Sequence, residues 1–457
     1  MRKRKRLAFW LTGTVLAFAV AGIVVVRMLG LTGAASALDE QLRLARREGL
    51  AVEPADLARS PVPDDQNAAH GLLEAFSAAK LLPGNPLKIV ADFNSTKVHD
   101  DRIRKSLNAL QPTLDTVVTS VQRPRFHLNW DWNKGYDLQR QEADVIDDVT
   151  KLDRCLRQRA HFEGLDGQRE GAIRSIIAAA RLDRLLAEET TVYCYLARIN
   201  IERGVLNEAE DLIRRFPGDA QMLQAAELVV TALGPLPDIR AALGHELVME
   251  RIFLHVLPNW HESRSTIHVD SNFAVAAQLL KLKSLSDRNE ANLVAETRRI
   301  YADLPRDGTD LSKAMRSVKG MPDNFDPEPP RPIADLAVYR MEHLLPEFKF
   351  GRGSLDAYAQ CVARRRVFLA GIDILMQKSR TGAFPAGWAK AGPDGIDPFT
   401  DKPLTYHRTR DGFVVYSFDE DRKDDGGRSY RQTSGSGTRQ DISFEYPTLS
   451  VDPTTKR

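Results

Sequence analysis

The 457-residue chain has only three cysteines, Cys155, Cys194 and Cys361. Their number is odd and their spacing fits no metal-binding motif, which excludes a disulfide scaffold as the basis of the fold. All three lie in apolar helical patterns, which favours buried, unreactive thiols. A Cys155–Cys194 bridge stays open if the protein resides in an oxidising compartment.

The chain also lacks an excess of either charge. Its net charge is +2, and five of its 64 basic residues lie within residues 2–6. Without those five, 59 basic residues face 62 acidic ones, a net charge of −3. The body of the protein therefore has no overall field that attracts nucleic acid, and we expect no nucleic-acid partner.

Familiar catalytic and nucleotide-binding motifs are missing as well. The sequence contains no nucleophile elbow, P-loop, dinucleotide fingerprint, HExxH pair or paired-cysteine motif. Each of these motifs combines residue types and spacing that a particular chemistry requires. Their absence leaves no sequence signature for an enzyme of those classes, so the prediction is that no catalytic residue is evident.

A long apolar run is present near the start of the chain. From Leu7 to Val26 it reads LAFWLTGTVLAFAVAGIVVV, and the next charge is Arg27. A helix of about 20 apolar residues spans a bilayer core, and flanking basic residues stay in the cytoplasm. We therefore predict a cytoplasmic basic tag at residues 1–6 and a single transmembrane helix at 7–31. This helix would sit in a bacterial inner membrane, with the rest of the chain in the periplasm.

The same start also permits a cleaved signal peptide, because Ala35-Ser36-Ala37 matches an A-x-A cleavage site. The apolar run is longer than a usual signal-peptide core, however, and Arg27 separates it from that site. An anchor is thus favoured over cleavage, and both interpretations export the body.

Helical periodicity dominates residues 38–335, which we predict to be one exported, mainly helical domain. Asn67 should cap a helix over 68–80, and the chain should then stay irregular to about Asp92. Helices joined by short turns form antiparallel hairpins, hence a helical bundle or a short α-solenoid. Further helices are expected over 38–50, 191–215, 219–233, 238–256, 272–284 and 288–303.

A proline- and acid-rich stretch, Pro322 to Pro332, reads as a boundary before a second module at 353–457. One long amphipathic helix is expected from Leu355 to Lys378, capped by Ser354. Short strands at 404–409, 413–417 and 442–446 should follow. The first two are joined by Arg410-Asp411-Gly412, and Asp-Gly is a strong hairpin signal.

Four segments in this module, TGAFP, DPFTDKPLTYHR, DGFVVYSFDEDRKDDGG and DISFEYP, occur in that order after the long helix. Together they resemble the C-terminal region of the major pseudopilins of type II secretion. They are more closely similar to the tails of a set of uncharacterised bacterial membrane-anchored proteins. The resemblance covers about the last quarter of the chain and implies an α+β module (a long helix plus antiparallel strands), but no chemistry.

The resemblance further implies a structural Ca²⁺ ion in the acidic loop after the second strand. The matching side chains are Asp419, Asp421, Asp424 and Asp425. Clustered carboxylates and backbone carbonyls suit this ion. Asp419 and Arg422 stand where the related tails commonly have glycine, so a solvated acidic turn is the competing interpretation.

Three further groups of residues are candidate catalytic, metal or binding sites. The segment 260–270 holds His261, Glu262, His268 and Asp270, but its spacing matches no zinc site and favours a polar surface loop. The aromatic run Phe126 to Tyr136 could stack on a sugar or a peptide, although packing at the start of a bundle is favoured. The triplet Arg364-Arg365-Arg366 should lie on the solvated side of its helix.

The sequence therefore favours a membrane-anchored, exported helical scaffold of the bacterial cell envelope, with protein partners and no evident catalytic motif. One alternative is an anchored envelope hydrolase with a cleft near Trp130, Trp132 and the 261–270 segment. The other is a component associated with a secretion system.

Overall fold

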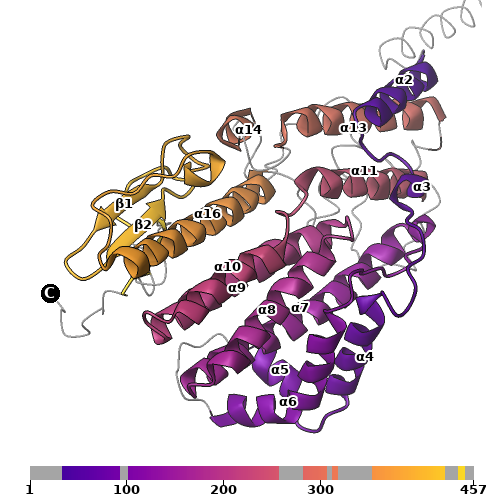
Figure 1. Cartoon of the computed structure of the whole chain (residues 1–457). Helices are drawn as coiled ribbons and strands as arrows, with labels where there is room; N and C mark the ends of the chain where they lie inside the picture. Colours follow the sequence, from indigo (N-terminus) through magenta and orange to yellow (C-terminus); the bar gives the residue numbers. More distant parts are fainter. Residues whose placement is uncertain are drawn as a thin grey trace, which may run out of the picture. The chain divides into compact units, whose positions relative to one another are not determined.

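The computed structural model describes residues 33–92, 101–256, 281, 283–305, 311–317, 352–427 and 441–447 (Figure 1). This part of the chain contains thirteen α-helices and one three-stranded antiparallel sheet. The predicted class, mainly helical with a small antiparallel sheet at the C-terminal end, is confirmed.

None of the helices within these ranges is long and apolar enough to cross a membrane. The predicted span at 7–31 and the tag at 1–6 lie outside the described residues, as do the boundary at 322–332 and most of the helix expected at 272–284.

The chain divides into two compact units that interleave in sequence. Unit 1 comprises Met1–Asp56, Leu243–Ala302 and Pro322–Phe350, and unit 2 comprises Leu57–Ala242, Asp303–Met321 and Gly351–Arg457. The long C-terminal helix and its strands thus belong to the same unit as most of the helical body.

In unit 1, α2 (Ala34–Arg47) and α13 (Lys283–Asp303) are joined by Arg298, which pairs with Glu48 and donates to Gln41 Oε1 at 2.7 Å. Arg251, on the part of α11 (Ile239–Val256) that lies in this unit, donates to Glu290 Oε1 of α13 at 2.6 Å. Within the described part of unit 1, these contacts join α2 and α11 to α13. The Arg251–Glu290 pair is largely buried, and a buried charge is stable only when it is paired.

Unit 2 begins as a stack of helices in which α7 packs against α8 and α9, and α8 packs against α10. Turns with left-handed glycines, Gly167 after α7 and Gly218 after α9, reverse the chain within a few residues. Its helices before α11 are α4 (Ala68–Lys80), α5 (Pro86–Ala91), α6 (Asp101–Ser120), α7 (Tyr136–Leu165), α8 (Arg169–Leu186), α9 (Val192–Arg215) and α10 (Ala220–Leu233). The short α3 (Pro54–Leu57) lies at the boundary of the two units.

Local capping explains where several of these helices begin. The side chains of Asn67, Thr191 and Asp219 each accept a backbone N–H in the first turn of the helix that follows. The prediction of Asn67 as the cap of a helix over 68–80 is confirmed. The prediction of an irregular chain to Asp92 is wrong, because α5 forms with Pro86 in its first turn and buries Leu87 and Val90.

The C-terminal part of unit 2 consists of α16 (Arg352–Thr381), β1 (Thr405–Arg408), β2 (Phe413–Ser417) and β3 (Ile442–Tyr446). The strands pair in the order β1-β2-β3, both pairs antiparallel, with Arg408 opposite Phe413 at the hairpin and Val415 opposite Phe444. The Asp-Gly hairpin is therefore confirmed. Ser354 lies inside α16, so its prediction as the cap is wrong.

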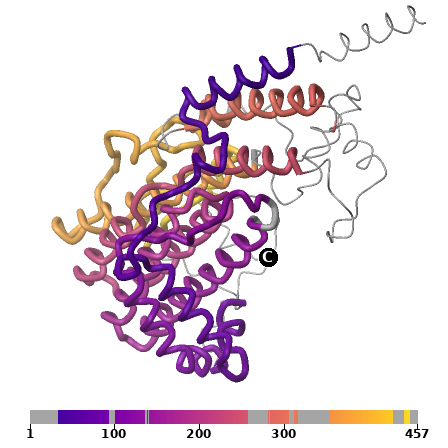
Figure 2. Tube along the Cα trace, turned by 90° about the vertical axis from the view of Figure 1, so that its right-hand side faces the viewer, coloured from indigo at the N-terminus to yellow at the C-terminus, as the bar shows by residue number. Residues whose placement is uncertain are grey.

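One face of the sheet packs on α16, where Gly371 lets the Phe444 ring approach the helix: a Cβ at Gly371 would lie 2.5 Å from Cγ of that ring. The same helix packs on its other side against α9 and α10 (Figure 1). Figure 2 shows the trace of the chain turned by 90°. Since α16 is covered on two sides, it is a core helix of unit 2.

Candidate functional site

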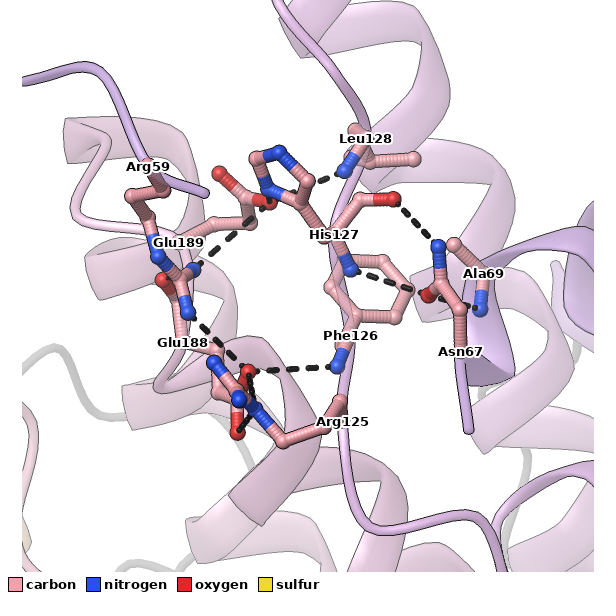
Figure 3. A network of polar contacts seen from close by, with 9 residues as sticks. All are labelled: Arg59, Asn67, Ala69, Arg125, Phe126, His127, Leu128, Glu188 and Glu189. Carbon is pink, nitrogen blue, oxygen red and sulfur yellow. Dashed lines mark hydrogen bonds and ion pairs between the residues drawn. The ribbon is translucent and has the colours of Figure 1, made fainter. Parts of the chain in front are cut away.

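Polar side chains fix an extended segment, residues 125–128, between two parts of the helical stack (Figure 3). On one side, Asn67 Oδ1 accepts the His127 N–H at 3.0 Å and the Ala69 N–H at 3.1 Å. Its Nδ2 donates to the His127 carbonyl at 2.8 Å. One buried amide thereby caps α4 and holds the neighbouring segment. We call the set Arg59, Asn67, Arg125, His127, Glu188 and Glu189 the polar staple.

The opposite side of the polar staple is formed by Glu188, in the turn between α8 and α9. Its carboxylate accepts hydrogen bonds from Arg59 at 3.0 Å, from Arg125 at 2.9 Å and from the Phe126 N–H at 3.3 Å. Arg59 also donates to the Glu188 carbonyl. Two arginines on one carboxylate neutralise its charge and bring residues 59 and 125 to the same turn.

Glu189, the next residue, points into the protein, and only 3% of it is exposed. Its Oε1 accepts the Leu128 N–H at 3.0 Å and lies 3.3 Å from His127 Nδ1. Burial raises the pKa of this carboxyl to about 7, against the opposing effects of the Leu128 N–H and Arg59. Burial also lowers the pKa of His127, which Arg59 and Arg125 lower further.

The aromatic run Phe126 to Tyr136 begins in this segment, and two of its larger aromatic rings are buried in unit 2. Phe126 is fully buried and Trp132 is 6% exposed, whereas Trp130 is only partly buried. The favoured interpretation, packing at the start of a bundle, agrees with these two side chains. Sequence reasoning missed the acidic partners, because Glu188 and Glu189 lie about 60 positions downstream and carry no motif.

The four aspartates of the predicted calcium loop lie after β2, and the side chains of three of them accept hydrogen bonds. Asp419 accepts from Gln360 at 3.0 Å, and Asp421 accepts from the Lys423 N–H. Asp424 accepts from the Tyr416 hydroxyl at 2.9 Å. Among the described residues, no group of three or more His, Cys, Asp or Glu side chains is arranged to hold a metal ion. The structure does not bring these four carboxylates together.

A fifth aspartate, Asp441, organises this loop and was not identified from the sequence. It is 2% exposed, and its Oδ2 accepts the N–H groups of Asp425 and Gly427 at 3.0 and 2.8 Å. Its Oδ1 is buried without a hydrogen-bond partner among the described residues. Burial raises the pKa of Asp441 to about 6. Arg422 in the same loop has φ = 56°, the left-handed conformation that favours glycine.

The arginine triplet of α16 is not solvated, contrary to the prediction. Arg364 and Arg366 are 6% and 7% exposed. Arg365 donates to both carboxylate oxygens of Glu202 on α9 at 2.6 Å and to the Gly234 carbonyl at 2.8 Å. A local pattern of three arginines suggests exposure, but Arg364 and Arg365 meet carboxylates more than 150 residues away, which the local pattern does not contain.

Arg364 makes the second contact of this kind. It pairs with Glu210 of α9 and donates to the Ser443 carbonyl of β3 at 3.0 Å. Arg214 of α9 also pairs with Glu210 and donates to the Glu445 carbonyl at 3.0 Å. The two arginines donate to backbone carbonyls of β3, an edge strand of the described sheet. Unpaired carbonyls at such an edge can otherwise pair with another strand.

Behind Glu202 lies a further buried pair, Asp183 of α8 and Arg198 of α9, with Asp183 Oδ2 3.1 Å from Arg198 Nη2. Arg198 also donates to the Pro235 carbonyl at 2.7 Å. Burial raises the pKa of Asp183 to about 7, although Arg198 opposes the shift. We call the set Asp183, Arg198, Glu202, Glu210, Arg364 and Arg365 the charged seam.

An open hollow at the turn between α7 and α8 carries charges of both signs, from Glu163, Glu170, Arg169 and Arg174. None of the residues proposed from the sequence lines it. The segment that holds His261, Glu262, His268 and Asp270 lies outside the described residues, so the hydrolase alternative keeps only Trp130 and Trp132 within them.

Comparisons of the chain with protein-family models, with curated proteins and with solved structures found no match.

Proposed function

We propose that the protein is a membrane-anchored scaffold of the bacterial cell envelope. The span at 7–31 would hold it in the inner membrane, and its exported helical body would present a surface to protein partners. In this proposal the chain performs no catalysis, and it ends in a module that resembles those of pseudopilins.

The observation that carries this proposal is that buried charged side chains pair with one another between helices. In the charged seam, buried arginines and carboxylates face each other across α8, α9 and α16. In the polar staple, the buried Glu189 and the partly exposed Glu188, Arg59 and Arg125 hold an extended segment between helices. A buried ion pair stabilises less than its geometry suggests, but it fixes one specific arrangement of the elements it joins. A rigid, specific assembly of helices is what a scaffold requires.

The anchor and the direction of export are supported by the sequence. The Leu7–Val26 run is uncharged, and basic residues 2–6 precede it. These are the features that set the orientation of a single-pass helix.

A structural Ca²⁺ ion in the acidic loop is part of the same proposal. The buried Oδ1 of Asp441, which has no hydrogen-bond partner among the described residues, supports it, since a buried carboxylate oxygen needs a donor or a cation. The carboxylates of Asp419, Asp421, Asp424 and Asp425 are not gathered in the structure, so the ion would have to draw them together with backbone carbonyls of the loop.

The test of the scaffold is affinity purification of the full chain from detergent-solubilised membranes after cross-linking in cells. We expect a small, reproducible set of envelope proteins. As the matched control, Leu16→Arg combined with Val20→Arg places two charges in the apolar run and should remove both the membrane fraction and the partners.

A reporter that is active only outside the cytoplasm, fused after Arg457, checks the compartment independently. Activity of the wild-type fusion, lost in the double arginine variant, is the expected result. A fusion active only in the cytosol would refute the exported scaffold, and recovery of no partner in the cross-linking experiment would count against the scaffold role.

A further inference from the structure

The polar staple contains a pair of buried groups that differs from the rest of it. Arg59, Arg125 and Glu188 are each partly exposed, and the two arginines compensate the charge of Glu188. His127 and Glu189 are buried instead, with side-chain exposures of 7% and 1%. Their nearest polar atoms, His127 Nδ1 and Glu189 Oε1, lie 3.3 Å apart.

No hydrogen bond forms at His127 Nδ1 among the described residues, although the carboxylate is this close. A neutral imidazole has one nitrogen that accepts a hydrogen bond, and a protonated carboxyl has one O–H to donate. The placement of the two groups therefore suits one proton between them, carried by Glu189 and accepted by His127 Nδ1.

We propose that a single proton held between Glu189 and His127 keeps the extended segment 125–128 attached to the helical stack, and that loss of this proton releases the segment. With the proton in place, Glu189 accepts the Leu128 N–H through Oε1 and donates to His127. Two consecutive residues of the segment are then held by one side chain.

The groups that face Glu189 explain why its ionised form is unfavourable. Arg59 approaches to 3.9 Å and favours the charge, as does the Leu128 N–H. Glu142 on α7 is fully buried and Glu188 is the adjacent residue; the charges of both disfavour it. The remaining neighbour is the buried thiol of Cys194 at the start of α9. An ionised Glu189 would be removed from water and would lie near two other carboxyls, while only Arg59 would offset its charge. Its ionised form is therefore unfavourable.

The sign of the response follows from linkage. The carboxyl binds its proton with a pKa of about 7 in the folded protein and near 4.5 when it reaches water. Below the lower value both states are protonated; as pH rises through the higher value, opening that exposes Glu189 becomes more favourable. Release of residues 125–128 is therefore expected at alkaline pH and attachment at mildly acidic pH.

Hydrogen–deuterium exchange of the full-length protein in detergent tests this proposal. It follows the N–H groups of Phe126, His127 and Leu128, all hydrogen-bonded in the polar staple. We expect their protection to fall about tenfold between about pH 6 and about pH 9 in the wild type. In Glu189→Gln, which is isosteric and cannot ionise, protection should be independent of pH once intrinsic exchange is corrected for.

A control variant separates this response from a general loss of stability. Asp183→Asn alters a buried carboxyl of the charged seam, outside the polar staple, and should keep the pH-dependent loss at residues 126–128. The proposal is overturned if Glu189→Gln loses protection with pH as the wild type does, or if the wild type shows no loss. Because the assay uses purified protein, neither result depends on the proposed partners or compartment.

Discussion

At the scale of single residues, Asn67 combines a role that is local in sequence with one that is not. Its carbonyl oxygen caps α4 through Ala69, and the same oxygen and the amide nitrogen bind the backbone of His127. A side chain that is 1% exposed has no water to replace these partners. Its contribution to stability should therefore exceed that of a surface cap.

We predict that Asn67→Ala lowers the free energy of unfolding by about 3 kcal/mol, since a cap and two buried hydrogen bonds are lost. Asn67→Asp keeps the acceptor for Ala69 and His127 but loses the donor to the His127 carbonyl. It should cost about 1 to 2 kcal/mol. Chemical denaturation measures both; a negligible loss in Asn67→Asp would show that only the accepted N–H groups matter, and equal losses would contradict a contribution from the cap.

Asp183 predicts a dependence of stability on pH. Its ordinary pKa is 3.8, and burial raises it to about 7 in the folded protein. The stability contributed by its proton is fully present below the ordinary value and is lost as pH rises through the folded value. Asp183→Asn should therefore reduce the fall in unfolding free energy between about pH 5 and about pH 8. An unchanged slope, measured by denaturant titration at several pH values, would contradict this.

At the scale of the elements, α16 shows how a helix predicted correctly from its periodicity acquires an unexpected environment. The local pattern placed the helix over 355–378, within the observed Arg352–Thr381. It could not show that α9 and the sheet cover opposite sides of the helix, because both contacts involve residues far away in sequence. The arginine triplet was consequently assigned to solvent.

The charged seam gives a prediction at this scale. Arg365→Ala leaves Glu202 buried without its bidentate partner and should cost about 3 kcal/mol. Arg380→Ala, at an exposed position of the same helix, should change stability by less than about 0.5 kcal/mol. Replacing both partners, Arg365→Met with Glu202→Met, should cost less than Arg365→Ala alone. A larger loss in the double variant, in thermal or chemical unfolding, would show that the pair is net stabilising.

Gly371 tests the contact between α16 and β3. Alanine favours helices over glycine by about 1 kcal/mol, yet a Cβ here would lie 2.5 to 2.6 Å from three ring atoms of Phe444. We expect Gly371→Ala to be destabilising by about 1 to 3 kcal/mol because the ring must move. Gly353→Ala, in the same helix with no atom within 4 Å of the added Cβ, is the matched control and should be neutral or stabilising. A stabilising Gly371→Ala would mean that the ring shifts easily.

At the scale of the whole molecule, the proposed compartment and the proposed metal ion are linked. An exported body meets more free calcium than a cytosolic one, and Asp441, directly before β3, binds the backbone of the loop where the ion is expected. Binding to the folded state alone raises its stability in proportion to the logarithm of the ligand concentration.

Added Ca²⁺ should therefore raise the melting temperature of the purified full-length protein, and EGTA should lower it. Asp441→Asn should remove the shift, whereas Asp411→Asn, at the exposed hairpin turn, should retain it. A melt that is the same with and without Ca²⁺ in the wild type would exclude the structural ion while leaving the scaffold proposal in place.

The sequence alone determined those features whose causes are local. The Asn67 cap, most of the helices between residues 68 and 256 and the Asp-Gly hairpin follow from side chains within a few positions of the element they shape. The short helix α5 was missed because six residues are too few for periodicity to show, and its formation depends on burying Leu87 and Val90 in the core.

Only the tertiary structure decided which charges are buried and what they face. Glu189 with His127, Arg365 with Glu202, and Asp441 with the acidic loop are separated in sequence by 62, 163 and up to 16 positions. A charged side chain looks alike in a sequence whether it is solvated or paired in the interior. Its burial is possible only when the fold supplies a partner, and that partner is specified by the packing of distant helices.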